Sequence, residues 1–336
     1  MARALVTGAT GLVGSHIAER LIASGWEVRA LVRRESRWLK SIGVEQTIGD
    51  VVDGTSFTSA ARGCDTIFHN AAAITDSGGW ETYRRLNVDG TRAAIDAAES
   101  AGARLMHLSS VAVYGPEGRY SSGGKKTNED SPLAALPEGA YYARSKRESE
   151  QLVMEAHASG RIWATAVRPT VIYGRRDRQF VPRAARLLRR GFAPLIGGGT
   201  STLSLVHAGN VADGAILAAE SEIAGGRVYN LAHDFDVTVR DCFLLGAKGL
   251  GRTLHFVPIP LWLAGAAVGG FKAATRLFTG GRWSAVSNAS IRMLTKDNPF
   301  TSERARRELG WSPRVRPEEG IPDAFHWWRE HPMGEQ

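Results

Sequence analysis

A strand, a glycine-rich turn and a helix follow one another at the start of the chain. Residues 4–7 are apolar or β-branched, as in a buried strand, and residues 15–23 have the apolar spacing of a helix. Between them, glycines recur at every third position, at Gly8, Gly11 and Gly14. Such glycines let the backbone approach a diphosphate, which the positive end of the helix stabilises. A tight turn without a ligand is the alternative, but the position between strand and helix favours a dinucleotide site. The expected contacts to the dinucleotide are Gly8, Thr10, Gly11, Leu12 and Val13.

Predicted strands alternate with predicted helices along the first half of the chain. This rhythm predicts an α/β fold, a Rossmann-type doubly wound parallel sheet with a smaller C-terminal α/β substrate lobe. We assign residues 1–173 and 203–232 to the dinucleotide-binding domain and residues 174–202 and 233–336 to the lobe. Ligands of such sheets bind beyond the carboxyl ends of the strands.

Composition narrows the class of protein. Among 336 residues there are only two cysteines, too few for a disulfide framework, and the first strand begins by Ala4, without room for a signal peptide. We therefore expect a cytoplasmic protein.

The net charge of +8 is carried mostly by arginine, densest over residues 161–190. No nucleic-acid-binding signature accompanies it, so we expect no nucleic acid partner and favour a solvated helix face. Histidines and cysteines are not spaced as metal ligands, so no metal site is predicted.

The end of the second predicted strand bears on the choice of cofactor. An acidic residue there would bind the ribose hydroxyl of NAD, whereas arginine accommodates the 2′-phosphate of NADP. Arg33 and Arg34 occupy this place, so NADP is favoured and NAD is the alternative. Asp50, after the third strand, is placed to contact the adenine or to cap the helix that begins near Thr55.

Three side chains are candidates for proton transfer. Tyr142 and Lys146 are four residues apart and so share a helix face, where the ammonium group favours the phenolate and lowers the tyrosine pKa. Such a tyrosine can give a proton to a carbonyl oxygen or take one from an alcohol. Ser110, at the end of the fifth strand, could hydrogen-bond the same oxygen.

These motifs together resemble the extended short-chain dehydrogenases/reductases, a family of the epimerase/dehydratase type. The matching segments run in family order over the first half to two-thirds of the chain, at residues 7–14, 49–50, 70–72, 87–91, 109–115, 142–146 and 168–174. The resemblance implies that Ser110 polarises the substrate oxygen, that Tyr142 is the acid/base and that Lys146 also holds the nicotinamide ribose. It further implies cofactor contacts by Asp50, Val51, Asn70, Ala71, Ala72, Asn87, Ser109, Arg168, Pro169, Thr170 and Val171.

Residues 28–33 and 203–213 resemble the dihydroflavonol-reductase and 3β-hydroxysteroid-dehydrogenase branches of the family. Nucleotide-sugar epimerases usually carry an arginine just before the second of these segments, and this chain has none there. An apolar carbonyl or alcohol substrate is therefore favoured over sugar epimerisation with tightly bound NAD, and a non-catalytic NADP-binding regulator is less favoured still. The resemblance also implies a homodimer through the helices after Asn87 and Tyr142. Residues 258–271 are apolar and are interpreted as pocket or core, with membrane-surface contact as the alternative.

Overall fold

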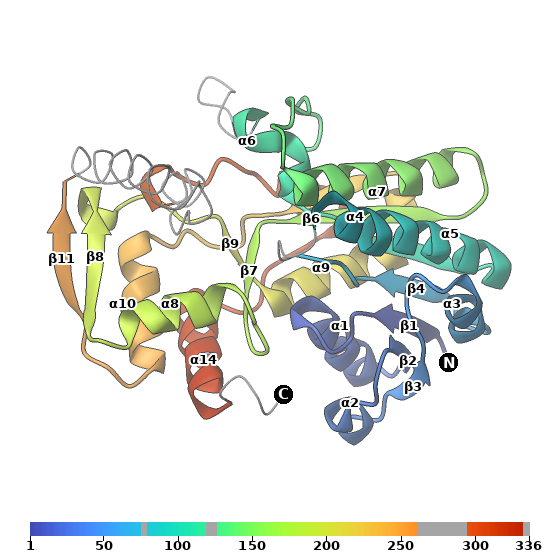
Figure 1. Cartoon of the computed structure of the whole chain (residues 1–336), viewed down its shortest axis with the longest axis horizontal. Coiled ribbons are helices and arrows are strands. Elements are labelled where there is room, and N and C mark those ends of the chain that lie inside the picture. Colours follow the sequence, from blue (N-terminus) through green and yellow to red (C-terminus); the bar gives the residue numbers. More distant parts are fainter. Residues whose placement is uncertain (75–78, 119–125, 261–293, 332–336) are drawn as a thin grey trace. The chain divides into compact units, whose positions relative to one another are not determined.

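The computed structural model describes residues 1–74, 79–118, 126–260 and 294–331, and the chain divides into two compact units. Unit 1 comprises Met1–Ile172, Val206–Asp234 and Phe300–Val315, and unit 2 comprises Tyr173–Leu205, Phe235–Pro299 and Arg316–Gln336 (Figure 1).

Unit 1 contains a seven-stranded sheet in the order β10-β6-β5-β4-β1-β2-β3, and every neighbouring pair is parallel. The order runs outward in both directions from β1, which is the pattern of a doubly wound sheet, so the predicted fold class is confirmed. The strands are β1 (Arg3–Thr7), β2 (Glu27–Val32), β3 (Glu45–Ile48), β4 (Thr66–His69), β5 (Arg104–Leu108), β6 (Ala164–Pro169) and β10 (Val228–Leu231).

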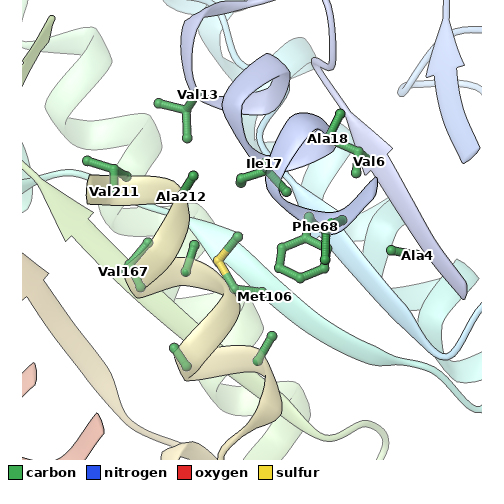
Figure 2. Close-up of a cluster of buried hydrophobic side chains, with 14 of the residues drawn as sticks. Ala4, Val6, Val13, Ile17, Ala18, Phe68, Met106, Val167, Val211 and Ala212 are labelled. Carbon is green, nitrogen blue, oxygen red and sulfur yellow. The ribbon is translucent and has the colours of Figure 1, made fainter. Parts of the chain in front are cut away.

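Helices cover both faces of this sheet because side chains of a strand alternate between its two faces. On one face, Val6, Phe68 and Met106 pack against α1 (Leu12–Ala23) and α9 (Ala208–Glu220), as Figure 2 shows. On the other face, Leu5, Ile67 and Leu105 pack against α3 (Gly54–Ala61), α5 (Gly90–Ala101) and α7 (Tyr141–Ala158). The shorter elements are α2 (Arg37–Ser41), α4 (Gly79–Tyr83), the π-helix η1 (Arg84–Asp89), η2 (Val111–Tyr114), α6 (Gly115–Gly118), η4 (Glu222–Ala224) and α13 (Glu303–Leu309).

Residues 300–315 belong to unit 1, although the sequence analysis placed them in the smaller lobe. Trp311 is 2% exposed, and its indole Nε1 donates to the Asn210 carbonyl at 2.9 Å. The Asn210 side chain also accepts from the backbone N–H groups of Arg314 (3.0 Å) and Val315 (2.9 Å). These long-range contacts fix the segment to α9, and local sequence patterns do not report contacts of this kind.

Unit 2 is smaller and contains the parallel strands β8 (Phe192–Ile196) and β11 (His255–Ile259). Of residues 258–271, which were interpreted as pocket or core, 258 and 259 lie in β11, and residues 261–271 lie outside the described residues, so this interpretation stays a prediction. No helix in the described part of the chain is long and apolar enough to cross a membrane. The other elements are α8 (Phe180–Leu188), η3 (Gly197–Gly199), α10 (Val239–Gly249) and α14 (Pro317–Glu330), and the chain enters and leaves unit 2 through β7 (Val171–Tyr173) and β9 (Leu205–His207).

Candidate cofactor and catalytic site

The glycine turn packs so tightly that side chains are excluded at two of its positions. Gly8 has a φ of +65°, and a Cβ there would lie 3.0 Å from the Ala71 backbone nitrogen. A Cβ on Gly14 would lie 2.3 Å from the Gly8 carbonyl oxygen. Gly11 caps α1 without a side-chain hydrogen bond, so no side chain of the cap occupies the N–H groups of the first turn. The turn therefore leaves a backbone cradle at the positive end of a helix, which fits a diphosphate.

The end of β4 lies against this turn. Thr7 Oγ1 accepts hydrogen bonds from the backbone N–H groups of Asn70 and Ala71, both at 3.1 Å. The Asn70 amide nitrogen donates to the carbonyls of Thr7 and Phe68, whereas Asn70 Oδ1 is buried without a partner among the residues that the structure describes. Because buried polar atoms are normally paired, this acceptor and the glycine cradle both fit a dinucleotide. The half-buried Ala72 continues the same segment.

Arg33 and Arg34 are exposed directly after β2, and neither makes an ion pair with a described residue. Two free guanidinium groups at this strand end suit a phosphate ligand. Asp50 Oδ1 accepts from the Val52 N–H at 3.2 Å, whereas the N-cap of α3 is Asp53. The alternative role of Asp50 as the cap of this helix is therefore wrong.

Tyr142 and Lys146 lie one turn apart at the start of α7, and Ser110 follows β5. The Lys146 ammonium is 4% exposed and donates to the Leu108 carbonyl at 2.6 Å, which joins α7 to the end of β5 two residues before Ser110. Burial lowers the Lys146 pKa to about 8, although Glu150 opposes the shift. Tyr142 is half-buried, and its ring lies 6.3 Å from that of Tyr83 in an edge-on arrangement. The Ser110 hydroxyl, also half-buried, accepts from the Ala112 N–H at 3.2 Å.

Asn87 lies in the π-helix η1 and its side chain is fully committed within the protein. Its Oδ1 accepts from the Ala73 N–H at 2.7 Å, and its Nδ2 donates to the Ala73 carbonyl at 3.1 Å and to the Ser145 hydroxyl at 2.8 Å. Ser145 immediately precedes Lys146 in α7. Asn87 thus connects Ala73 to the helix that carries the candidate catalytic pair, and its contact with a cofactor stays a prediction.

The side chain of Arg168 also forms hydrogen bonds within the protein. Its guanidinium pairs with both carboxylate oxygens of Glu150, at 2.8 and 2.5 Å, and donates to the Tyr114 hydroxyl at 2.8 Å. The tyrosine donates in turn to Asn230 Oδ1 at 2.9 Å. Arg168 is 5% exposed, so its side chain is a structural cation, and the residues that remain at the strand end are Pro169, Thr170 and Val171.

Most of the matched residues lie at one end of the sheet in unit 1. The glycine turn, the segment after β4, the arginines after β2, and the group Ser110, Tyr142 and Lys146 all lie at the carboxyl ends of the strands. Val51 is half-buried beside Gly90, and Ser109 is 2% exposed with a hydroxyl that has no hydrogen-bond partner among the described residues. Among the described residues, no group of three or more histidine, cysteine, aspartate or glutamate side chains could hold a metal ion.

Comparison with known proteins agrees with this geometry. The sequence model of the NAD dependent epimerase/dehydratase family matches residues 4–232. A 4-hydroxy-2-methyl-3-oxo-4-farnesyl-3,4-dihydroquinoline-1-oxide ketoreductase of Stigmatella aurantiaca is 31% identical, covering 95% of this chain and 94% of the relative. A 2-alkyl-3-oxoalkanoate reductase of Shewanella oneidensis is 29% identical, covering 96% of this chain and 85% of the relative. The crystal structure of gox2253 is 28% identical and superposes with a TM-score of 0.77 over 100% of both chains.

Proposed function

The chain belongs to the NAD-dependent epimerase/dehydratase family, and from this premise we propose that it is an NADP-preferring reductase of apolar ketones. Its curated relatives are named as oxidoreductases, including the two reductases above. The observation that carries the proposal is that the Lys146–Leu108 hydrogen bond holds the start of α7, with Tyr142 and Lys146, against the end of β5, which Ser110 follows. A regulator that only binds the cofactor would not need this group.

A nicotinamide dinucleotide held by the glycine turn and Lys146 would supply the hydride for reduction of a carbonyl carbon. The Ser110 hydroxyl and the Tyr142 phenol hydrogen-bond the carbonyl oxygen, and the phenol gives it a proton, so the product is a secondary alcohol. The Lys146 ammonium stabilises the phenolate that remains. Because burial has lowered the Lys146 pKa to about 8, its charge is sensitive to pH just above neutrality.

Two observations support an apolar substrate. The relatives named above act, by their names, on a farnesylated quinoline oxide and on 2-alkyl-3-oxoalkanoates. In this chain, residues 198–204 contain no arginine that could hold a sugar diphosphate. The substrate class therefore comes from the relatives and from the absence of a charged anchor in the sequence.

The experiment that tests the proposal has two parts. Freshly purified protein is denatured to identify any released dinucleotide, and the emptied protein is then assayed with NADPH and an ester of a 2-alkyl-3-oxoalkanoate as the probe. We expect little retained cofactor and consumption of NADPH. Stoichiometric, tightly held NAD would instead favour the second candidate, a nucleotide-sugar epimerase or dehydratase, which the matched family also includes.

The cofactor preference can be tested at Arg33. We expect Arg33→Ala to weaken NADPH binding about 10- to 100-fold, because a charge-assisted hydrogen bond to the 2′-phosphate is lost, and to leave NADH binding unchanged. Arg62→Ala is the control, since Arg62 is also exposed but follows α3 at the opposite edge of the sheet. Isothermal titration with both cofactors measures the effect. Equal losses for NADPH and NADH would refute a role in phosphate recognition.

We also propose that the chain forms a homodimer through α5 and α7. A groove between these helices is lined by both signs of charge, including Arg92, Asp96 and Glu155, beside the apolar Leu152. A twofold axis would place this groove, with the apolar Leu152, against the same groove of a second copy. Sedimentation of the wild type should give a dimer, and Leu152→Arg should shift it toward monomer.

The cytoplasmic location stays a prediction, for which the free and buried Cys64 and Cys242 provide support.

A further inference from the structure

Three polar side chains form a buried row across the sheet. Thr7 of β1, His69 of β4 and His107 of β5 are paired positions on neighbouring strands. Thr7 is fully buried, and each histidine is only 1% exposed. The two imidazole rings stack with centroids 5.7 Å apart, and Phe57 of α3 lies 5.8 Å from the His69 ring. The apolar Leu5, Ile67 and Leu105 lie on the same face of these strands. Buried imidazoles normally have hydrogen-bond partners, so the partners of these two rings must be identified.

The hydrogen bonds of Thr7 determine the tautomer of His69. Thr7 Oγ1 already accepts from the N–H groups of Asn70 and Ala71, so its own proton goes to His69 Nδ1 at 3.0 Å. His69 therefore accepts at Nδ1 and carries its proton at Nε2. That Nε2–H group is buried and has no hydrogen-bond partner in the described part of the chain.

Three more buried polar atoms also have no hydrogen-bond partner within residues 1–74, 79–118, 126–260 and 294–331. They are both ring nitrogens of His107 and the hydroxyl of Ser109, which lies two residues further on the same side of the strand. Polar groups in such positions are normally satisfied, and internal water supplies the partner where the protein does not. Four such atoms in one layer, each on a side chain no more than 2% exposed, therefore indicate a site for internal water.

Lys146 faces this layer from α7. Its ammonium donates to the Leu108 carbonyl, between His107 and Ser109 in the chain, and has further N–H groups to place. Burial and then the Lys146 charge lower the pKa of His69 to about 3, and the same causes keep the pKa of His107 well below its usual range. Both imidazoles therefore stay neutral and can accept hydrogen bonds. The charge of Glu150 of α7 acts on Lys146, and Glu150 is itself paired with Arg168 of β6. The neutral groups packed around this region are Phe57 of α3 against His69, Asn87 of η1 bonded to Ser145, and Tyr83 of α4 against Tyr142.

We propose that His69, His107 and Ser109 form a buried water site in which an internal water accepts a hydrogen bond from Lys146 and donates to His107. His107 is then a positioning residue that fixes the direction of the Lys146 ammonium and stabilises its charged form. The inference rests on the proposed function only for its effect on turnover, and its direct tests do not use activity.

The first test is a crystal structure of the wild-type chain at a resolution that shows ordered water. We expect a water within about 3.2 Å of both Lys146 Nζ and a ring nitrogen of His107. A dry layer, or a direct contact between the lysine and the imidazole, would overturn the proposal.

The second test measures the Lys146 pKa by NMR on protein labelled with ¹³C-lysine, with Lys146→Arg to assign the signal. We expect His107→Leu to lower this pKa by about half a unit to one unit, because the ammonium loses an acceptor, and His107→Gln to restore most of it. Met106→Leu is the control, since Met106 lies on the opposite face of the same strand in the α1 and α9 core.

An unchanged Lys146 pKa in His107→Leu would also overturn the proposal. If that variant does not fold, the wild-type crystal structure and His107→Gln still decide, because the glutamine should keep the pKa near its wild-type value. If the water is found and His107→Leu lowers the Lys146 pKa, but the wild type has no reductase activity, the proposed function would be rejected and this inference would still hold.

Discussion

Replacing Tyr142 by phenylalanine should lower kcat of the reductase reaction by about 10²- to 10⁴-fold, the range that general acid catalysis supplies. The phenol is the proposed proton donor to the substrate oxygen, and phenylalanine removes this proton without changing the shape of the ring. Tyr142 packs edge-on against Tyr83, and a phenyl ring keeps this contact. Binding of NADPH should therefore change little. Steady-state kinetics with the keto-ester probe and titration with NADPH separate the two effects.

Tyr141→Phe is the matched control, because Tyr141 precedes Tyr142 in α7 and is also half-buried. Its ring lies 6.4 Å from Trp80, a contact that phenylalanine also preserves. We expect this variant to retain kcat within about twofold, since no proton transfer is assigned to it. Full activity in Tyr142→Phe would mean that another group protonates the product, and equal losses in both variants would point to a structural effect of the helix end.

The parts of the site that are local in sequence could be predicted from the sequence. The turn at Gly8, Gly11 and Gly14 joins the strand and helix that were expected, because its conformation depends on residues within one short segment. The fold class followed from the alternation of strands and helices, and it is confirmed. The roles of Ser110, Tyr142 and Lys146 in chemistry are still predictions, although the structure places all three at the junction of β5 and α7.

What could not be predicted depends on partners far apart in the chain. The side chain of Arg168 matched a cofactor-binding segment, yet it is taken up by Glu150, 18 residues away, and Tyr114, 54 residues away. His69 and His107 are 38 residues apart in the sequence, and only the strand register brings their rings together. Asn210 could not be identified as the residue that fixes residues 311–315, because its partners lie about a hundred positions further on. In each case the sequence shows the polar residue and not its partner.

Removing one partner of the buried ion pair between Arg168 and Glu150 should strongly destabilise the fold. Arg168→Met should lower the free energy of unfolding by about 3–5 kcal/mol, because it leaves the Glu150 carboxylate buried without its cation. The carboxylate side chain is 8% exposed, so water cannot replace the two hydrogen bonds that it accepts from the guanidinium. The Tyr114 hydroxyl also loses the donor at 2.8 Å. Urea denaturation followed by circular dichroism measures the loss.

A second substitution separates the destabilisation caused by an unpaired buried charge from the net contribution of the ion pair to the free energy of unfolding. In Arg168→Met combined with Glu150→Met, neither charge remains, and apolar replacements of buried ion pairs are often neutral or stabilising. We therefore expect the double variant to recover most of the stability that the single variant loses. Arg161→Met is the control for an exposed pair, since Arg161 bonds Glu99 and Asp96 at the surface and exposed pairs contribute little. If Arg168→Met were as mild as this control, Arg168 would not act as the buried cation that holds β6 to α7, and its guanidinium would again be a candidate for the cofactor.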